Sequence, residues 1–183
     1  MTAEQIVTER LVLRPMQPGD VPAFAAYRSH PGVARWQSWD TGYSVADGER
    51  LVAAQAGAGL AEPGRWVQVA ALDRSTGELC GDCAVHLEEG PPRTAEIGVT
   101  FAPQAQGRGL AGEALRAFVT HLFEARDVHR VIARADDRNA PVHRLLERLG
   151  FRCEARHVDA ELFKGDWCTM RTYAVLRREW PLG

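Results

Sequence analysis

The chain has 183 residues, of which 45% are hydrophobic and 25% charged, and its formal net charge is −2. This length and composition are typical of one soluble globular domain, so we expect residues 1–183 to form a single domain. The small net charge argues against bulk nucleic acid or an anionic membrane as a partner. No apolar run reaches the roughly 20 residues of a membrane helix. No signal peptide is visible, and we expect a cytoplasmic protein.

Hydrophobic patterns in the first hundred residues predict two helices among several strands. Residues 10–15 alternate as a strand does, and Pro18-Gly-Asp20 begins a helix that ends near Ser29. We expect a loop over residues 30–42 and a second helix, capped by Ser44, that ends near Ala58. Three strands follow, over residues 65–72, 78–87 and 94–101.

The second half predicts two helices around a strand and then a hairpin. Apolar residues at helical spacing indicate a helix over residues 107–125. The remaining elements are a strand over 129–135, a helix over 139–149 capped by Asn139 and ended by Gly150, and a hairpin of 151–163 and 167–176 turned at Lys164-Gly165. The order predicts a mixed α/β domain with hairpins before the central strand and a crossover after it.

Cys80 and Cys83 have the C-x-x-C spacing of a zinc half-site or a redox pair. Their surroundings read as a strand, in which positions three apart point to opposite faces. A second C-x-x-C that would complete a zinc site is absent from the sequence. We therefore interpret both cysteines as structural and expect no metal.

Residues 107–112, Gly-Arg-Gly-Leu-Ala-Gly, match the pattern G-x-G-x-x-G. Such glycines let the backbone approach a phosphate closely, and the following helix start offers free N–H groups and a positive dipole end. A Rossmann unit would have a strand running straight into the glycines and an acidic residue at the tip of the next strand. Here Pro103 intervenes and Asp127 precedes the next strand. We therefore predict a pyrophosphate site outside a Rossmann fold.

Two motifs together resemble the signatures of the GNAT superfamily of acyl-CoA-dependent N-acyltransferases. Gln104-Ala-Gln-Gly-Arg-Gly109 fits the first, Q/R-x-x-G-x-G/A, and the Asn-capped segment 139–151, which ends in Leu-Gly-Phe, resembles the second. Thr8-Glu-Arg-Leu-Val-Leu-Arg-Pro15 and Ala95-Glu-Ile-Gly98 resemble the RimJ/RimL-type branch, the protein N-terminal acetyltransferases. Thr169 departs from that branch, which tends to have Asp there.

The resemblance implies a central, mostly antiparallel sheet with helices on both faces and a fourth strand that splays from its neighbour. It also implies acetyl-CoA as co-substrate. Backbone groups near the splay would pair with the pantetheine arm, the glycine segment would hold the pyrophosphate, and Asn139 would contact the pantetheine region or serve as a plain helix cap. The implied cofactor-binding residues are Val99, Thr100, Phe101, Gln106, Gly107, Arg108, Gly109, Leu110, Ala111 and Asn139.

Glu96 is the candidate general base, since the branch has a carboxylate there and a protonated amine must lose a proton before it attacks. The alternative is a structural carboxylate. A backbone N–H near Val99 or Thr100 would stabilise the oxyanion. The family often has Ser at the position of Val142 or Tyr at that of Leu146, and neither residue here can protonate a thiolate. Water or another group such as His143 or Tyr173 supplies the proton, or the thiolate leaves unaided, or catalysis is poor.

Trp36 and Trp39 lie in the predicted loop where the family builds its acceptor pocket, and they line that pocket or cover the edge of the core. We expect a protein N-terminus as acceptor, with a small amine as second choice. The rival from another class is a non-catalytic acyl-CoA-binding module. An exposed strand on the last hairpin is compatible with a homodimer.

Overall fold

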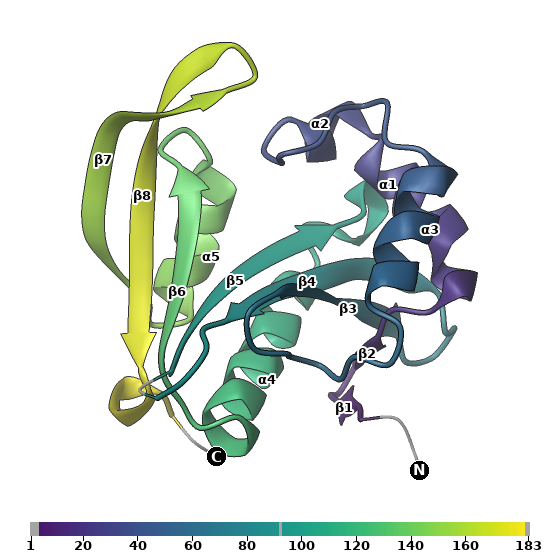
Figure 1. The fold of residues 1–183 in the computed structure, drawn as a ribbon, viewed down its shortest axis with the longest axis horizontal. Helices are drawn as coiled ribbons and strands as arrows, with labels where there is room; N and C mark the ends of the chain where they lie inside the picture. Colours follow the sequence, from purple (N-terminus) through teal and green to yellow (C-terminus); the bar gives the residue numbers. More distant parts are fainter. Residues whose placement is uncertain (1–3, 92, 182–183) are drawn as a thin grey trace.

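The computed structural model describes residues 4–91 and 93–181, and one eight-stranded sheet runs through it in the order β1-β2-β3-β4-β5-β6-β8-β7 (Figure 1). The strands are β1 (Ile6–Val7), β2 (Leu11–Pro15), β3 (Trp66–Asp73), β4 (Leu79–Leu87), β5 (Arg93–Phe101), β6 (Val128–Asp136), β7 (Arg152–Phe163) and β8 (Asp166–Leu176). Neighbouring strands pair antiparallel except β5 and β6, which are parallel. This confirms the predicted mixed α/β fold with a mostly antiparallel sheet.

Five helices join these strands: α1 (Val21–Arg28), α2 (Pro31–Ala34), α3 (Val45–Ala54), α4 (Leu110–Ala125) and α5 (Ala140–Arg148). The described chain also has three short 3-10 turns, η1 (Pro18–Asp20), η2 (Pro103–Ala105) and η3 (Arg177–Glu179). No helix of the described residues is long and apolar enough to cross a membrane.

The predicted element order is correct, with four local corrections. β1 was not predicted, because two residues carry no readable period. The single turn of α2 lies where a loop was predicted, since Pro31 at its first position favours a helix start. α3 ends at Ala54, four residues before the predicted end. α4 begins at Leu110 rather than Gly107, because Gly107 and Gly109 have φ of 73° and 77°.

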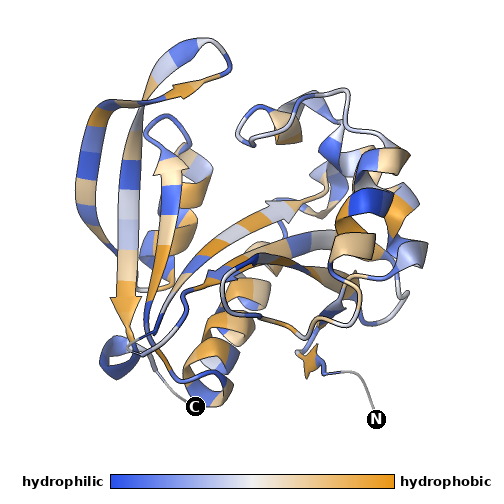
Figure 2. Ribbon diagram, in the orientation of Figure 1, coloured by the Kyte–Doolittle hydropathy of each residue, from blue (hydrophilic) through white to orange (hydrophobic). Residues whose placement is uncertain are grey.

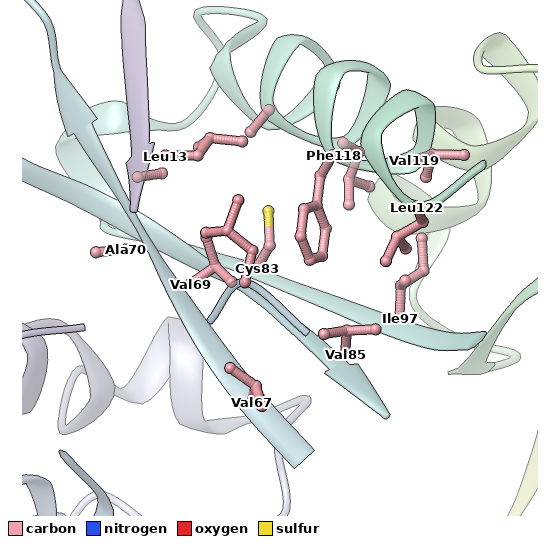
Figure 3. Packing of buried hydrophobic residues seen from close by; sticks show 14 of the residues in the cluster. Leu13, Val67, Val69, Ala70, Cys83, Val85, Ile97, Phe118, Val119 and Leu122 are labelled. Atoms are coloured by element: carbon pink, nitrogen blue, oxygen red, sulfur yellow. The ribbon is translucent and has the colours of Figure 1, made fainter. Parts of the chain in front are cut away.

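The helices cover opposite faces of the sheet. On β4, Cys83 is fully buried and belongs to the apolar cluster beneath α4 that Figure 3 shows, with Val85 and Phe118. The preceding residue, Asp82, contacts α1 through Tyr27. Successive strand residues point to opposite faces, so α4 packs on one face and α1 on the other. Figure 2 shows the alternating hydrophobic and hydrophilic residues along β7 at the outer edge.

Cys80 and Cys83 both lie on β4, as predicted, and both thiols are free and buried. The ladder with β3 shifts here, because Ala71 pairs with Gly81 and Leu72 with Leu79. Cys80 therefore occupies a β-bulge. Burial raises the pKa of the Cys83 thiol, which makes it an inert core residue. Among the described residues, no three His, Cys, Asp or Glu side chains are placed to hold a metal ion.

Strands β5 and β6 separate along their length, as the resemblance implied. Their last pair joins Glu96 to Ile132. Beyond it, β5 continues to Phe101 paired with β4, and β6 continues to Asp136 paired with β8 (Figure 1). The β5 edge that faces β6 therefore lacks a strand partner over residues 97–101.

Gly81 allows β4 to approach the end of β5, which has no partner on its other edge, at short distance. A Cβ built on Gly81 would lie 2.4 Å from the Thr100 carbonyl oxygen and 2.8 Å from the Phe101 Cα. Both are backbone atoms, so a larger residue would have to push the strands apart.

We predict that Gly81→Ala destabilises the fold by about 1–3 kcal/mol, the usual cost of overpacking a tight contact. Gly98→Ala is the matched control on β5, since its added Cβ would meet the Ala84 Cβ at an ordinary 3.6 Å. Its free energy of unfolding should change by less than about 0.5 kcal/mol. Urea unfolding followed by circular dichroism measures both, and equal effects in the two variants would contradict the prediction.

Candidate active site

A cavity of about 790 Å³ opens where β5 and β6 separate, and four chain segments line it. They are the α2 segment (defined as residues 31–40), the end of β5, the start of α4 and the face of α5 that carries Val142 and Arg144. Ten residues predicted as site residues come together there: Trp36, Val99, Thr100, Phe101, Gln106, Gly107, Gly109, Leu110, Ala111 and Asn139.

The glycine segment between η2 and α4 forms an anion-binding geometry. Gly109 is the N-cap of α4 in a left-handed conformation. The side-chain amide of Gln106 donates a 2.8 Å hydrogen bond to the Phe101 carbonyl, which ties the segment to the end of β5. The first N–H groups of an α-helix have no partner within the helix. These groups and the positive end of the helix dipole face the cavity and suit a phosphate.

Glu113, in the first turn of α4, fastens this segment to the start of the chain. Its carboxylate accepts hydrogen bonds from the Thr8 hydroxyl (2.6 Å), the Arg10 backbone N–H (2.8 Å) and the Arg10 Nε (2.7 Å). Burial opposes ionisation of Glu113, but these hydrogen bonds outweigh it and lower its pKa. Arg10 also donates to the Arg108 carbonyl at 2.9 Å. The one acidic side chain of the described cavity lining is therefore occupied.

Three exposed arginines line the cavity between the two helices, Arg116 on α4 and Arg144 and Arg148 on α5. None of them lies within ion-pair distance of an acidic side chain in the described chain. This end of the cavity therefore presents positive charge that is not neutralised by the protein.

Asn139 occupies the predicted N-cap position of α5, but its side chain makes no capping hydrogen bond. The backbone of Asn139 explains why, because its φ of −83° and ψ of 66° differ from the extended conformation of a usual N-cap. Asn139 is half-buried and lines the cavity. Its amide is therefore available to a bound molecule.

On the opposite face of the sheet, a buried ion pair holds α1 against β4. Arg28 and Asp82 are 2% and 1% exposed, and their side chains meet at 3.2 Å. Tyr27 donates a 2.5 Å hydrogen bond to the same carboxylate. The Arg28 guanidinium lies 3.7 Å from the ring centre of Trp39, whose Nε1 donates to the Arg28 carbonyl. Burial raises the pKa of the Asp82 carboxyl, and Arg28 opposes that rise.

Comparison with known protein families identifies the fold. A model of the acetyltransferase (GNAT) domain matches residues 10–152. The chain belongs to the GNAT acetyltransferase family. Members of this family use acetyl-CoA, and the chain is an N-acetyltransferase with an amine acceptor, which confirms the predicted family, enzyme class and co-substrate.

Individual relatives place this acetyltransferase within the family. It is 27% identical to the uncharacterized N-acetyltransferase p20 of Bacillus licheniformis over 177 residues, 97% of this chain and 98% of that protein. It is 31% identical over 87 residues to the ribosomal protein uS5-alanine N-acetyltransferase of Escherichia coli, 48% of this chain and 45% of that enzyme. The structure of Mycobacterium smegmatis RimJ in complex with CoA-disulfide superposes with a TM-score of 0.84 at 24% identity, covering 98% and 90% of the two chains.

Three predicted site residues lie outside the cavity lining of the acetyltransferase. Arg108 is exposed and contributes its carbonyl to Arg10. Trp39 stacks on Arg28 and covers the edge of the core, which was the alternative interpretation. Glu96 is half-buried on β5, opposite His86 and Ile132 on the neighbouring strands.

The structure shows where the candidate proton donors for the leaving thiolate lie relative to the cavity. Val142 lines the cavity, whereas Leu146 is 1% exposed and does not. His143 and Tyr173 stack on each other with ring centres 5.5 Å apart, and both are buried away from the cavity. Neither of these two candidates therefore reaches the site.

Sequence reasoning missed the Arg28–Asp82 pair and the three cavity arginines. Arg144 and Arg148 are four residues apart on one helix, so they share a face, and this spacing was a readable signal. Arg28 and Asp82 are 54 residues apart, and no local pattern connects them.

We predict that Asp82→Asn costs about 3–5 kcal/mol of stability, because it leaves the Arg28 cation buried without its counter-charge. The double variant Arg28→Met/Asp82→Asn should recover most of this loss, since a neutral pair of similar volume needs no compensation. Chemical unfolding of the two single variants and the double variant gives the coupling free energy. Additive losses would show that the pair is not energetically coupled.

Proposed function

We propose that this acetyltransferase acetylates the N-terminal α-amine of a protein or peptide. The observation that carries the proposal is the charge of the cavity. The part of its described lining that comes from the α2 segment has no carboxylate, and the one carboxylate of the lining, Glu113, is already occupied by Thr8 and Arg10. A polyamine carries several positive charges and needs carboxylates to bind it, whereas a chain terminus presents a single amine on a peptide backbone.

The proposed donor site follows the cavity from the splay to the arginines. The free edge of β5 at Val99–Phe101 pairs with the amides of the pantetheine arm, as an added strand would. The Asn139 amide contacts the same arm. The N–H groups of residues 106–111, at the glycines and the start of α4, hold the pyrophosphate.

The three arginines form the outer end of the proposed donor site. CoA carries a 3′-phosphate beyond its pyrophosphate, and guanidinium groups pair with phosphate through two parallel hydrogen bonds. Arg116, Arg144 and Arg148 border the cavity beyond the start of α4, so we assign them to that phosphate.

The acceptor enters from the other face of the sheet. α4 and α5 border the donor half of the cavity, whereas the α2 segment lies on the α1 side and contributes Trp36 and Gln37 to the lining. Gln37 donates a 3.1 Å hydrogen bond to the Thr100 hydroxyl, which joins this wall to the end of β5. The amine therefore reaches the thioester between the α2 segment and the last hairpin.

Glu96 takes the proton that the amine releases. It lies three residues before Val99 on β5, roughly 10 Å along the strand, so one or more waters carry the proton between them. The amine nitrogen forms a bond to the carbonyl carbon, a β5 backbone N–H stabilises the oxyanion, and the carbon–sulfur bond then breaks. No acid of the described cavity lining faces Val142, so the leaving sulfur departs as thiolate, with a pKa near 8.5 for a simple thiol.

A thiol-release assay with matched acceptors tests the proposal. Peptides with a free N-terminus should turn over, whereas the same peptides with a blocked N-terminus and a free lysine, spermidine and an aminoglycoside should not. Preference for spermidine over every peptide would identify a small-amine enzyme. Tight acetyl-CoA binding without turnover of any amine would favour a non-catalytic module.

We predict that Glu96→Gln lowers kcat/KM by about 100-fold or more, because general base catalysis contributes at least this much. The rate should recover as pH rises toward the pKa of the amine, since the free amine then needs no base. Acetyl-CoA binding, measured by calorimetry, should not change. Glu88→Gln, an exposed carboxylate just beyond β4, is the control. An unchanged pH profile in Glu96→Gln would overturn the assignment.

We predict that Gly109→Ala weakens acetyl-CoA binding about tenfold, or roughly 1.4 kcal/mol. Its φ of 77° disfavours any residue with a Cβ, so the N–H groups at the start of α4 would shift. Gly112→Ala is the matched control from the same motif, because Gly112 lies inside α4 and its added Cβ meets only Leu145 Cδ1 at 3.5 Å. Isothermal titration compares the two, and equal binding would count against the phosphate role.

A further inference from the structure

Lys164, at the tip of the β7–β8 hairpin, is the single lysine among 22 basic residues of the chain. Its ammonium donates hydrogen bonds of 2.7 Å to the carbonyls of Ala34 and Trp39, and it lies 3.2 Å from the Asp40 carboxylate. All three partners belong to the α2 segment, 124 to 130 residues away in sequence. The hairpin tip is therefore fastened to the segment that borders the cavity.

The backbone at this position does not favour lysine. Lys164 and Gly165 both have positive φ, 51° and 90°, and they form a two-residue turn between Phe163 and Asp166. Turns of this kind favour Asn-Gly, because asparagine tolerates the left-handed conformation better than lysine does. A strained residue kept in a turn points to a use for its side chain.

The rest of the hairpin tip is weakly packed. Leu162 and Trp167, which pair beside the turn, are each 64% exposed. The Asp40 side chain is 85% exposed, so the two backbone carbonyls, rather than the ion pair, hold the lysine. The ammonium also lies 5.5 Å from the Phe163 ring centre.

The α2 segment is fixed on its other sides by contacts already described. Trp39 is bound to α1 through Arg28, and Gln37 is bound to β5 through Thr100. Lys164 adds the third attachment, which joins the segment to the tip of the β7–β8 hairpin. Figure 1 shows the tip of the hairpin reaching toward α2.

We propose that Lys164 is a positioning residue that joins the two walls of the acceptor opening and so sets the affinity for the acceptor amine. The inference rests on the proposed acceptor route between the α2 segment and the hairpin. Lys164 itself lies outside the cavity lining, so it acts through Trp36 and Gln37.

Lys164→Asn separates this role from a merely structural one. Asparagine suits the turn, so the melting temperature should stay the same or rise, while the attachment is lost. We expect the acceptor KM to rise about five- to tenfold, the size of effect expected for losing charged hydrogen bonds at a partly exposed site. The kcat and the KM for acetyl-CoA should stay within twofold. Lys164→Arg, which keeps charge and donors, should restore most of the acceptor affinity.

Asp166→Asn is the matched control, because it changes a charge in the same turn without touching the α2 segment. Acceptor KM values in Lys164→Asn that equal those of wild type and Asp166→Asn would overturn the inference. A fall in kcat alone would also overturn it, since that would place Lys164 in the chemistry rather than in acceptor binding.

Chemical labelling of the wild-type enzyme tests the contact between Lys164 and the α2 segment without an activity assay. Because Lys164 is the only lysine, acylation by an N-hydroxysuccinimide ester can be followed at one peptide by mass spectrometry. We expect it to react at least tenfold more slowly than the lysine of a short unstructured peptide, and Asp40→Asn to keep most of this protection. Labelling of Lys164 as fast as the peptide lysine would show that the contact with the α2 segment does not form. Absence of turnover with intact protection would instead count against the proposed function.

Discussion

The separation of β5 from β6 after the Glu96–Ile132 pair is the constraint on which the rest of the site depends. It leaves the backbone edge of residues 97–101 without a strand partner and opens the cavity between two halves of the sheet. A strand that loses one neighbour must be held by the other, and the missing side chain of Gly81 allows β4 to do this at close range. The same close packing fixes the position of Thr100 and Phe101, which border both the donor and the acceptor side.

Hydrogen bonds between distant segments hold the two sides of this opening. Glu113 connects the start of α4 to Thr8 and Arg10, more than 100 residues earlier. The motif at residues 8–15 and the first turn of α4, which look unrelated in sequence, thus contact each other. Arg28 and Asp82 play the corresponding part on the other face, where they hold α1 and Trp39 against β4.

Much of this architecture was predictable from periodicity and from two family motifs. The strands, α4 and the turn at Lys164-Gly165 follow from local patterns, and ten predicted site residues gather in one cavity. What could not be predicted depends on register and tertiary packing. Trp39, for example, turns toward a buried cation that lies on another element. Asn139 has the right position for a cap, but its backbone angles release its side chain.

The distribution of charge separates the two halves of the proposed reaction. The donor half carries arginines and a helix start, which suit the phosphates of the donor. Glu96 lies between Ala95 and Ile97 of the buried cluster on β5, so the base that we propose points to the other face of the sheet. A carboxylate placed among the arginines would be held ionised and would be a weaker base, which gives a physical reason for keeping the two groups apart.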